Sequence, residues 1–250
     1  MGLLDNKTAI VTGSSRGVGA DVAKFLAAEG AAVVVNYRQK APRANKVVAE
    51  IEAAGGRAVA VGADLTSAEG VHALASAAME NFGSLDLLVL NASGGMESGM
   101  EENYALKLNR DAQVNMLNAA ALLMPEGSRV VFVTSHQAHF IETVPTMPEY
   151  EPVARSKRAG EDALRELVPN LAEKGISLVV VSGDMIEGTV TATLLDRSNP
   201  GAIEARRAEA GKLYSVSEFA AEIATMATAD VETGYTHYVG GADYFGKNAV

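Results

Sequence analysis

A glycine-rich turn near the start of the chain has the composition of a phosphate-binding loop. Gly13, Gly17 and Gly19 follow the short apolar run 9–11 and precede an amphipathic segment. Glycine lets the backbone turn tightly and lets a pyrophosphate come close to main-chain N–H groups. The N-terminus of the following helix would direct free N–H groups and a partial positive charge at that phosphate. We therefore expect a dinucleotide-binding site at this turn.

Residues for several other kinds of chemistry are missing or scattered. The chain has no cysteine, which excludes disulfides, thiolate metal sites and cysteine nucleophiles. Its four histidines form no HExxH motif or similar cluster, so no metal site is expected. The sequence identifies no carboxylate partner for His136 or His139, and we interpret both as ordinary loop histidines.

The glycine turn belongs to a regular alternation of strand and helix patterns. Strands are predicted at seven short runs, mostly apolar: 9–11, 33–37, 58–61, 85–90, 129–134, 177–181 and 237–239. Helices are predicted at about 18–29, 43–54, 67–82, 101–123 and 151–175, with a last helix from Ser217. This alternation is typical of a parallel sheet with helices on both faces, which binds ligands at the carboxyl ends of its strands. The expected fold is α/β, a single doubly wound Rossmann-type domain over residues 1–250.

Charge and hydropathy limit the partners that we expect. The formal net charge is −10, and no basic stripe is present that could offset nucleic-acid phosphates. The first residues, MGLLDNK, contain no basic region before an apolar run, and no window approaches the roughly 18 apolar residues of a membrane span. We expect a cytoplasmic protein that acts on a small molecule and has no nucleic-acid or membrane partner.

Several motifs, in order and at the predicted strand ends, resemble those of the short-chain dehydrogenase/reductase family over nearly the whole chain. They are 12–19 (TGSSRGVG), 64–65 (DL), 91–94 (NASG), Asn109, Ser135, Lys157 and 238–241 (YVGG). The resemblance implies a nicotinamide-dependent oxidoreductase that forms a homodimer or homotetramer.

The resemblance also implies a set of cofactor-binding residues. The glycines would admit the pyrophosphate, and Asp64 would accept a hydrogen bond from the adenine amino group. A role for Asp64 in a turn or helix cap is the alternative. The full expected set is Gly13, Ser15, Arg16, Gly17, Val18, Gly19, Tyr37, Arg38, Asp64, Leu65, Asn91, Ala92, Ser93, Lys157, Gly183 and Ile186.

Charge at the end of the second predicted strand favours NADP(H) over NAD(H). An NAD-selective site usually has an acidic residue there, which binds the ribose 2′-hydroxyl. This chain has Tyr37 followed by Arg38, and Arg16 lies in the glycine turn. Two guanidinium groups suit a 2′-phosphate, which a carboxylate would repel.

The resemblance implies catalytic roles for Ser135, Lys157 and Asn109. In the family a serine polarises the substrate oxygen, a tyrosine exchanges the proton, a lysine activates that tyrosine, and an asparagine supports a water relay. The tyrosine usually lies four residues before the lysine, where this chain has Val153. Tyr150 lies seven residues before Lys157, about two helical turns away and nearly on the same face. We expect Tyr150 to donate the proton; a role as a loop aromatic is the alternative.

Three functions stay open at this point. We favour transfer of a hydride to or from a carbonyl (ketone or 3-oxo) substrate. The Tyr-x6-Lys spacing also resembles the divergent enoyl-thioester reductases of the family, although the glycine turn is of the ordinary type. The valine at position 153 raises the third possibility, a protein that binds NADP without catalysis.

The substrate pocket is expected to come from loops. Residues 184–212 are charged and partly helical, and we expect them to form a substrate lid. A solvated helical excursion is the alternative for that segment. Loops around 96–100 and 139–147 would complete the pocket.

Overall fold

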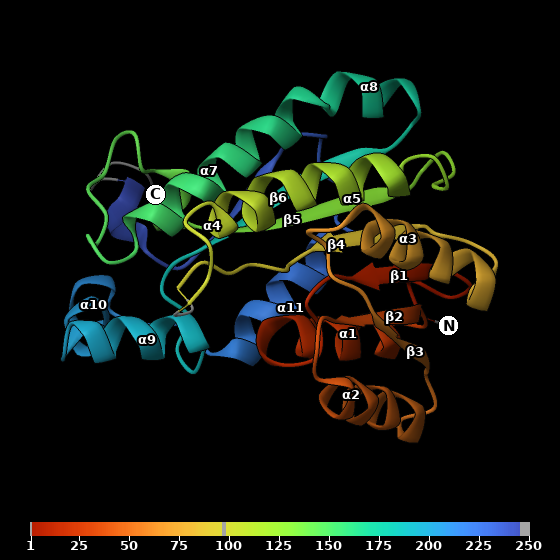
Figure 1. Cartoon of the computed structure of the whole chain (residues 1–250), viewed down its shortest axis with the longest axis horizontal. Coiled ribbons are helices and arrows are strands. Elements are labelled where there is room, and N and C mark those ends of the chain that lie inside the picture. Colours follow the sequence, from red (N-terminus) through yellow and green to blue (C-terminus); the bar gives the residue numbers. More distant parts are fainter. Residues whose placement is uncertain (1, 97–98, 246–250) are drawn as a thin grey trace.

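The computed structural model describes residues 2–96 and 99–245 of the 250-residue chain (Figure 1). Residues 97 and 98, in a loop expected to shape the pocket, lie outside the described residues. One sheet of seven parallel strands has the order β3-β2-β1-β4-β5-β6-β7. The strands are β1 Thr8–Val11, β2 Ala32–Tyr37, β3 Arg57–Gly62, β4 Leu87–Leu90, β5 Arg129–Ser135, β6 Ser177–Gly183 and β7 Thr236–Val239. The predicted doubly wound fold is confirmed, and its switch point lies between β1 and β4, beside the glycine turn.

Helices cover both faces of this sheet (Figure 1). One face carries α1 (Gly17–Ala28), α2 (Ala41–Ala53) and α11 (Val216–Met226). The other carries α3 (Ala68–Phe82), α5 (Ala112–Ala120) and α7 (Glu151–Glu166). None of the described helices is long and apolar enough to cross a lipid bilayer.

The central strands contribute side chains to a separate apolar core on each face. In β1, Ala9 and Val11 pack in the core of α1, α2 and α11, whereas Ile10 packs in the core of α3 and α5. In β2, Val33 and Val34 divide in the same way. Successive side chains of a strand point to opposite faces, so a strand buried on both faces must be apolar throughout. This is why the strands could be recognised as unbroken apolar runs.

The long helix predicted over 101–123 is interrupted. It consists of α4 (Tyr104–Leu106), a π-helical turn over Lys107–Asp111, and α5. The side-chain amide of Gln113 donates to the main-chain oxygen of Leu108 at 2.9 Å and so gives this turn an additional bond. Such π-helical turns often occur at functional sites, and this one contains Asn109.

Two other helix boundaries differ from the prediction. The helix expected over 151–175 divides into α7 and α8 (Val168–Glu173), because Pro169 has no N–H with which to continue the α7 bonding pattern. The last helix begins at Val216 instead of Ser217. Its first turn is capped by Ser215, whose hydroxyl and main-chain N–H exchange hydrogen bonds with Glu218.

The segment after β6 contains two helices, α9 (Val190–Ser198) and α10 (Ala202–Ala210). Ala192 and Leu195 of α9 pack in a third apolar cluster, together with Tyr150, Val153 and Met185. Part of the segment is therefore buried against the start of α7. The short helix α6 (His136–His139), which follows β5 directly, was not predicted.

Candidate active site

Two cavities lie at the carboxyl ends of the strands and share part of their lining. The outer cavity extends along the glycine turn and the end of β2, and the inner cavity lies at the end of β5 and the start of α7. Both are lined by Val18, Asn91, Ser93, Thr189 and Thr191. A ligand can therefore reach from one cavity into the other.

The glycine turn forms one wall of the outer cavity. Gly13 and Gly17 have φ angles of +63° and +58°, a conformation that favours glycine. Arg16 precedes α1 without capping it, and the first turn of α1 has no acidic side chain. No side chain therefore satisfies the free N–H groups or neutralises the partial positive charge at the N-terminus of α1, and both can act on a bound pyrophosphate. Gly19 has a packing role, since a Cβ there would lie 2.5 Å from Nδ2 of Asn91.

Asn36, at the end of β2, fixes the glycine turn and was not predicted as a site residue. Its Oδ1 accepts a hydrogen bond from the main-chain N–H of Gly13 at 3.0 Å. Its own main-chain N–H donates to Oγ of Ser14 at 2.9 Å. The side chain is buried, and its Nδ2 donates to the oxygen of Ala63 at 3.2 Å. The glycine turn is thereby tied to β2 and to the end of β3.

Four positively charged side chains line the outer cavity. Arg16 and Arg38, both predicted, line it together with Lys40 and Arg43, which were not singled out. Arg38 donates a hydrogen bond to the hydroxyl of Tyr104 and lies 5.5 Å from the centre of its ring. Asp64 is the one carboxylate among the described residues that line this cavity.

Asp64 lines the same cavity and also stabilises a turn. Its Oδ1 accepts hydrogen bonds from the main-chain N–H and the hydroxyl of Thr66, at 2.9 and 2.7 Å. Leu65, Ala92 and Ser93, also predicted to bind the cofactor, line the same cavity. Both readings of Asp64 are thus compatible with its position, and the adenine contact stays a prediction.

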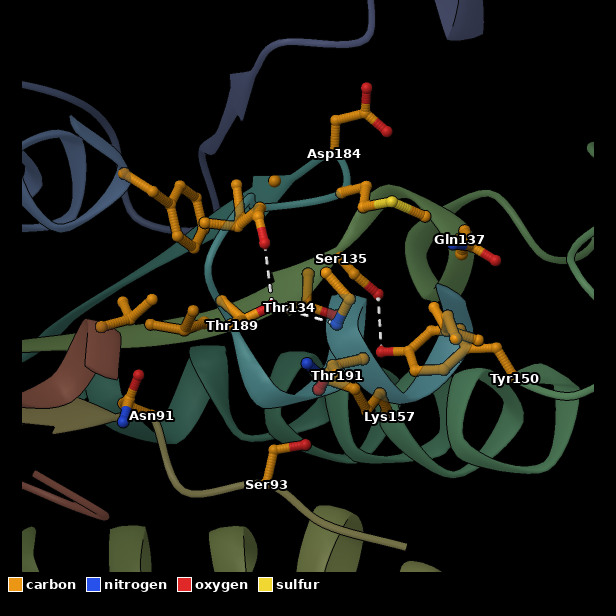
Figure 2. A pocket seen from close by; sticks show the side chains of 18 residues that line it. Asn91, Ser93, Thr134, Ser135, Gln137, Tyr150, Lys157, Asp184, Thr189 and Thr191 are labelled. Atoms are coloured by element: carbon orange, nitrogen blue, oxygen red, sulfur yellow. Dashed lines mark hydrogen bonds between the residues drawn. The ribbon is translucent and has the colours of Figure 1, made fainter. Parts of the chain in front are cut away.

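The inner cavity brings three of the four predicted catalytic residues together. Oγ of Ser135, the last residue of β5, lies 3.3 Å from Oη of Tyr150, and Lys157 lines the same cavity (Figure 2). Tyr150 directly precedes α7 and is 4% exposed. Val153, at the usual tyrosine position, is buried in the third apolar cluster. A tyrosine seven residues before the lysine therefore reaches the same serine.

Lys157 is a cation without a fixed partner in the described part of the chain. It lies in α7, is half-buried, and has no ion pair or hydrogen bond from its ammonium group to another described residue. Neighbouring charges of α7 are paired: Arg155 with Glu151, and Arg158 with Asp162. The ammonium of Lys157 is thus available to groups that enter the cavity.

Asn109, the fourth predicted catalytic residue, is not among the described residues that line either cavity. Its Nδ2 donates to the oxygen of Gly94 at 2.8 Å and to Oγ of Ser156 at 2.9 Å. Its Oδ1 accepts from the N–H of Gly94 at 3.2 Å. The side chain therefore ties the loop after β4 to α7, and the water relay stays a prediction.

Gly183 and Ile186, two of the predicted cofactor-binding residues, line the inner cavity. A Cβ on Gly183 would lie 2.6 Å from the ring of Phe219, so only glycine fits without displacing that ring. Ser182, the residue before Gly183, is fully buried and contacts His136 instead of the cavity.

His136 and His139 lie in α6 and not in a loop, and neither is among the described residues that line the inner cavity. Nε2 of His136 lies 3.0 Å from the oxygen of Gly240, which can only accept, so Nε2 carries a proton and Nδ1 accepts from Ser182 at 2.8 Å. Burial lowers the pKa of His136, which keeps the ring neutral.

His139 has the carboxylate partner that the sequence did not identify. Its Nδ1 lies 2.8 Å from Oε1 of Glu161, a fully buried side chain that also accepts from Arg165 at 2.9 Å. Burial alone would raise the pKa of Glu161, but the bond from His139 and the charge of Arg165 outweigh it and hold the pKa below its usual value. This is a packed network behind α6 and α7.

Arg206 of α10 connects the inner cavity wall to the end of the described chain. Its Nε donates to both carboxylate oxygens of Asp184, at 2.9 and 3.1 Å, and its two Nη atoms donate to Asp243 at 2.8 Å each. The Asp184 side chain is 3% exposed and that of Arg206 12%. Burial alone would lower the pKa of Arg206, but the two carboxylates raise it above its usual value, so the group stays charged.

Replacing Arg206 should therefore destabilise the protein. We expect Arg206→Met to lower the free energy of unfolding by about 2–4 kcal/mol, because it leaves the Asp184 carboxylate buried without its partner. Arg207→Met is the matched control on α10, since its pairs with Glu187 and Glu204 are more exposed and contribute about 1 kcal/mol or less. Urea denaturation measures the free energy of unfolding of both variants. Equal losses would contradict the role of the buried pair.

Comparisons of sequence and of structure relate this chain to known proteins. Residues 7–199 match the short chain dehydrogenase family. An oxidoreductase of Methylorubrum extorquens, itself uncharacterised, is 38% identical over 204 residues, which cover 77% of this chain and 79% of that protein. The 1-cyclohexenylcarbonyl-CoA reductase of Streptomyces collinus is 34% identical over 187 residues, which cover 72% of this chain and 65% of the reductase. The crystal structure of an angucycline C-6 ketoreductase with bound NADP is 28% identical, covers 96% of each chain and has a TM-score of 0.82.

A doubly wound parallel sheet with joined cavities at its carboxyl edge defines a nucleotide-binding α/β protein. Within that class, the chain belongs to the short-chain dehydrogenase/reductase family and is an NAD(P)-dependent oxidoreductase. The resemblance inferred from the motifs is thereby confirmed.

Proposed function

We propose that this protein transfers a hydride between NADP(H) and a carbonyl compound. The observation that carries the proposal is the pair of hydroxyl groups from Ser135 and Tyr150, 3.3 Å apart in a cavity that also contains Lys157. Two hydroxyl groups at this spacing suit a single substrate oxygen. Negative charge develops on that oxygen when a hydride adds to the carbonyl carbon, so donors aimed at it lower the barrier.

Each residue has a distinct role in this proposal. When bound, the nicotinamide supplies or accepts the hydride. Ser135 donates a hydrogen bond to the substrate oxygen, and Tyr150 gives that oxygen a proton. The ammonium of Lys157 stabilises the phenolate that remains on Tyr150, because opposite charges attract strongly in a partly buried site. Asn109 acts indirectly, because it positions α7 against the loop after β4.

NADP(H) is the proposed cofactor because of the charge in the outer cavity. Arg16, Arg38, Lys40 and Arg43 line the end where a ribose 2′-phosphate would lie, and the uncapped N-terminus of α1 suits the pyrophosphate. Guanidinium groups bind phosphate oxygens in a bidentate manner. The similar ketoreductase structure was solved with NADP, which agrees with this assignment.

A substitution at Arg38 tests the choice of cofactor. Arg38→Ala should weaken NADP binding by about 1.5–3 kcal/mol through loss of a charged hydrogen bond, and should hardly change NAD binding. Isothermal titration with both cofactors measures the difference. Lys46→Ala is the control, because Lys46 is an exposed cation in α2, the helix that follows Arg38. Equal losses for NADP and NAD would refute the phosphate contact.

A second function is favoured by two specific observations. The seven-residue interval from Tyr150 to Lys157 resembles that of enoyl-thioester reductases, and the Streptomyces collinus relative is named for reducing a cyclohexenyl thioester. In that reaction the hydride would add to a double bond conjugated to the carbonyl. Tyr150 would then protonate the resulting enolate oxygen.

We also propose two features that the family implies. Residues 184–212, with α9 and α10, would act as a lid, because Thr189, Thr191 and Leu195 line the inner cavity from this segment. The protein would assemble as a homodimer or homotetramer, for which family membership is the support.

Oxidation of NADPH on a panel of substrates separates the candidate functions. The panel contains ketones, quinones and enoyl thioesters, each incubated with the purified protein. Turnover of ketones is expected. Turnover of enoyl thioesters alone would support the second function, and no turnover with tight NADPH binding would show a protein that binds NADP without catalysis.

A further inference from the structure

Gln137 is a polar residue of the inner cavity that no catalytic role accounts for. It lies in α6, two residues after Ser135, and lines the cavity together with Ser135 and Tyr150. Figure 2 shows these three residues at one end of the cavity, with Asn91 at the other end. Gln137 is thus placed beside the hydroxyl pair that would hold the reacting oxygen.

The orientation of the Gln137 amide is determined by its neighbours. Its Oε1 accepts hydrogen bonds from Oγ1 of Thr146 at 2.5 Å and from the main-chain N–H of Met147 at 3.3 Å. A main-chain N–H can only donate, so the atom facing Met147 must be the amide oxygen. Nε2 has no hydrogen bond to another residue in the described ranges. Its two N–H donors are therefore free for a ligand.

Two other polar side chains that line the inner cavity, Asp184 and Thr189, are already paired. The carboxylate of Asp184 is bound by Arg206. The hydroxyl of Thr189 donates to the oxygen of Ile186 at 2.8 Å and accepts from the N–H of Ala192 at 3.1 Å. Much of the remaining wall is apolar and consists of Val133, Met185, Ile186, Ala192, Leu195 and Phe219.

We propose that Nε2 of Gln137 donates a hydrogen bond to a second, neutral oxygen of the substrate. The substrate would be a largely apolar carbonyl compound with a further acceptor close to the reacting carbonyl. Cα atoms two residues apart lie within about 7 Å of each other, and the side chains of Ser135 and Gln137 line the same cavity. The group held by Gln137 would therefore lie near the one held by Ser135. The inference rests on the proposed carbonyl chemistry of Ser135 and Tyr150. In it, Gln137 determines which carbonyl compounds are preferred as substrates.

Two compounds of equal chain length test this assignment. Ethyl 3-oxohexanoate carries an ester next to its ketone, and 4-nonanone has the same chain with methylene groups in place of the ester. Dissociation constants are measured by titration into protein saturated with NADP⁺, so that binding is read without turnover. Steady-state kinetics with NADPH follow for the same pair.

Two substitutions probe the amide. Gln137→Met removes both donors at similar volume, and Gln137→Glu keeps an oxygen for Thr146 and Met147 but replaces the donors with an acceptor. We expect the preference for the keto ester over 4-nonanone to fall about three- to tenfold in Gln137→Met, the range of one neutral hydrogen bond, and further in Gln137→Glu. In kinetics the change should appear in KM more than in kcat. NADPH affinity reports that each variant is folded.

The outcomes distinguish this inference from the function beneath it. An unchanged preference in both variants would overturn the role of Gln137, as would a wild-type protein that binds neither compound or does not prefer the keto ester. If wild type binds both compounds but reduces neither, the proposed carbonyl reduction fails, while the binding preference of the variants still decides whether Gln137 holds the second oxygen.

Discussion

Tyr150→Phe should lower kcat for a ketone substrate by about 10²–10⁴-fold, the usual contribution of a positioned general acid. The substitution removes only the hydroxyl that lies 3.3 Å from Ser135, and phenylalanine fits the same buried space in the third apolar cluster. NADPH affinity should hardly change, because Tyr150 is not among the described residues that line the outer cavity. Stopped-flow or steady-state oxidation of NADPH gives the rate, and titration gives the affinity.

Tyr235→Phe is the matched control for this loss. Its side chain is 43% exposed and lies outside the described lining of both cavities, so the rate should stay within about twofold of wild type. If Tyr150→Phe retained the wild-type rate, the proton would have to come from another group and the central role of Tyr150 would be lost.

Lys157→Met should impair both catalysis and cofactor binding. We expect kcat to fall about 10²–10³-fold, because the cation that stabilises the Tyr150 phenolate is removed from a partly buried cavity. Lys157 is also one of the expected cofactor-binding residues, so the dissociation constant of NADPH should rise about ten- to a hundredfold, the value of one charged hydrogen bond. Both constants are measured on the same preparation, so that a folding defect is recognised.

Arg155→Met is the control for Lys157→Met. It removes a cation two residues away on α7, where the side chain is exposed and paired with Glu151. Neither kcat nor NADPH affinity should change by more than about twofold. A Lys157→Met variant that lost no more activity than this control would contradict the role of the ammonium.

The fold could be predicted from the sequence because helices cover both faces of the sheet, so that its strands are mostly apolar. Strands such as β2 are apolar at nearly every position, and the helices between them end at glycines such as Gly83, with a φ of +80°. These signals are local. The interruption of 101–123 includes a hydrogen bond from a side chain to a carbonyl five residues earlier, which the apolar pattern does not show. The division of α7 from α8 falls at Pro169, a local signal that the prediction passed over.

Only part of the candidate site could be predicted from the sequence. Residues at strand ends, such as Asn91 and Ser135, could be placed because parallel strands end at one edge of the sheet. The convergence of Tyr150 on Ser135 could not be derived from spacing, because the interval from Tyr150 to Lys157 does not fix where either residue lies relative to the end of β5.

Other site residues carry no signal in the sequence. Gln137 directly follows His136, yet the histidine is buried and paired whereas the glutamine faces the cavity. Arg206 is one of two adjacent arginines, and only the fold shows that it is the one bound to Asp184. Charge and residue type identify such groups as polar, but only three-dimensional packing decides which of them face a ligand.

Transfer of deuterium from labelled cofactor tests the central claim most directly. The protein is incubated with NADPH that carries deuterium at the transferred position of the nicotinamide, in one reaction with ethyl 3-oxohexanoate and in another with an enoyl thioester. The products are examined by mass spectrometry and NMR. Reduction of a carbonyl predicts an alcohol with deuterium on the carbinol carbon, in wild type and far more slowly in Tyr150→Phe. No labelled alcohol from this ketone, together with deuterium at the β-carbon of an enoyl thioester whose carbonyl stays intact, would contradict the account.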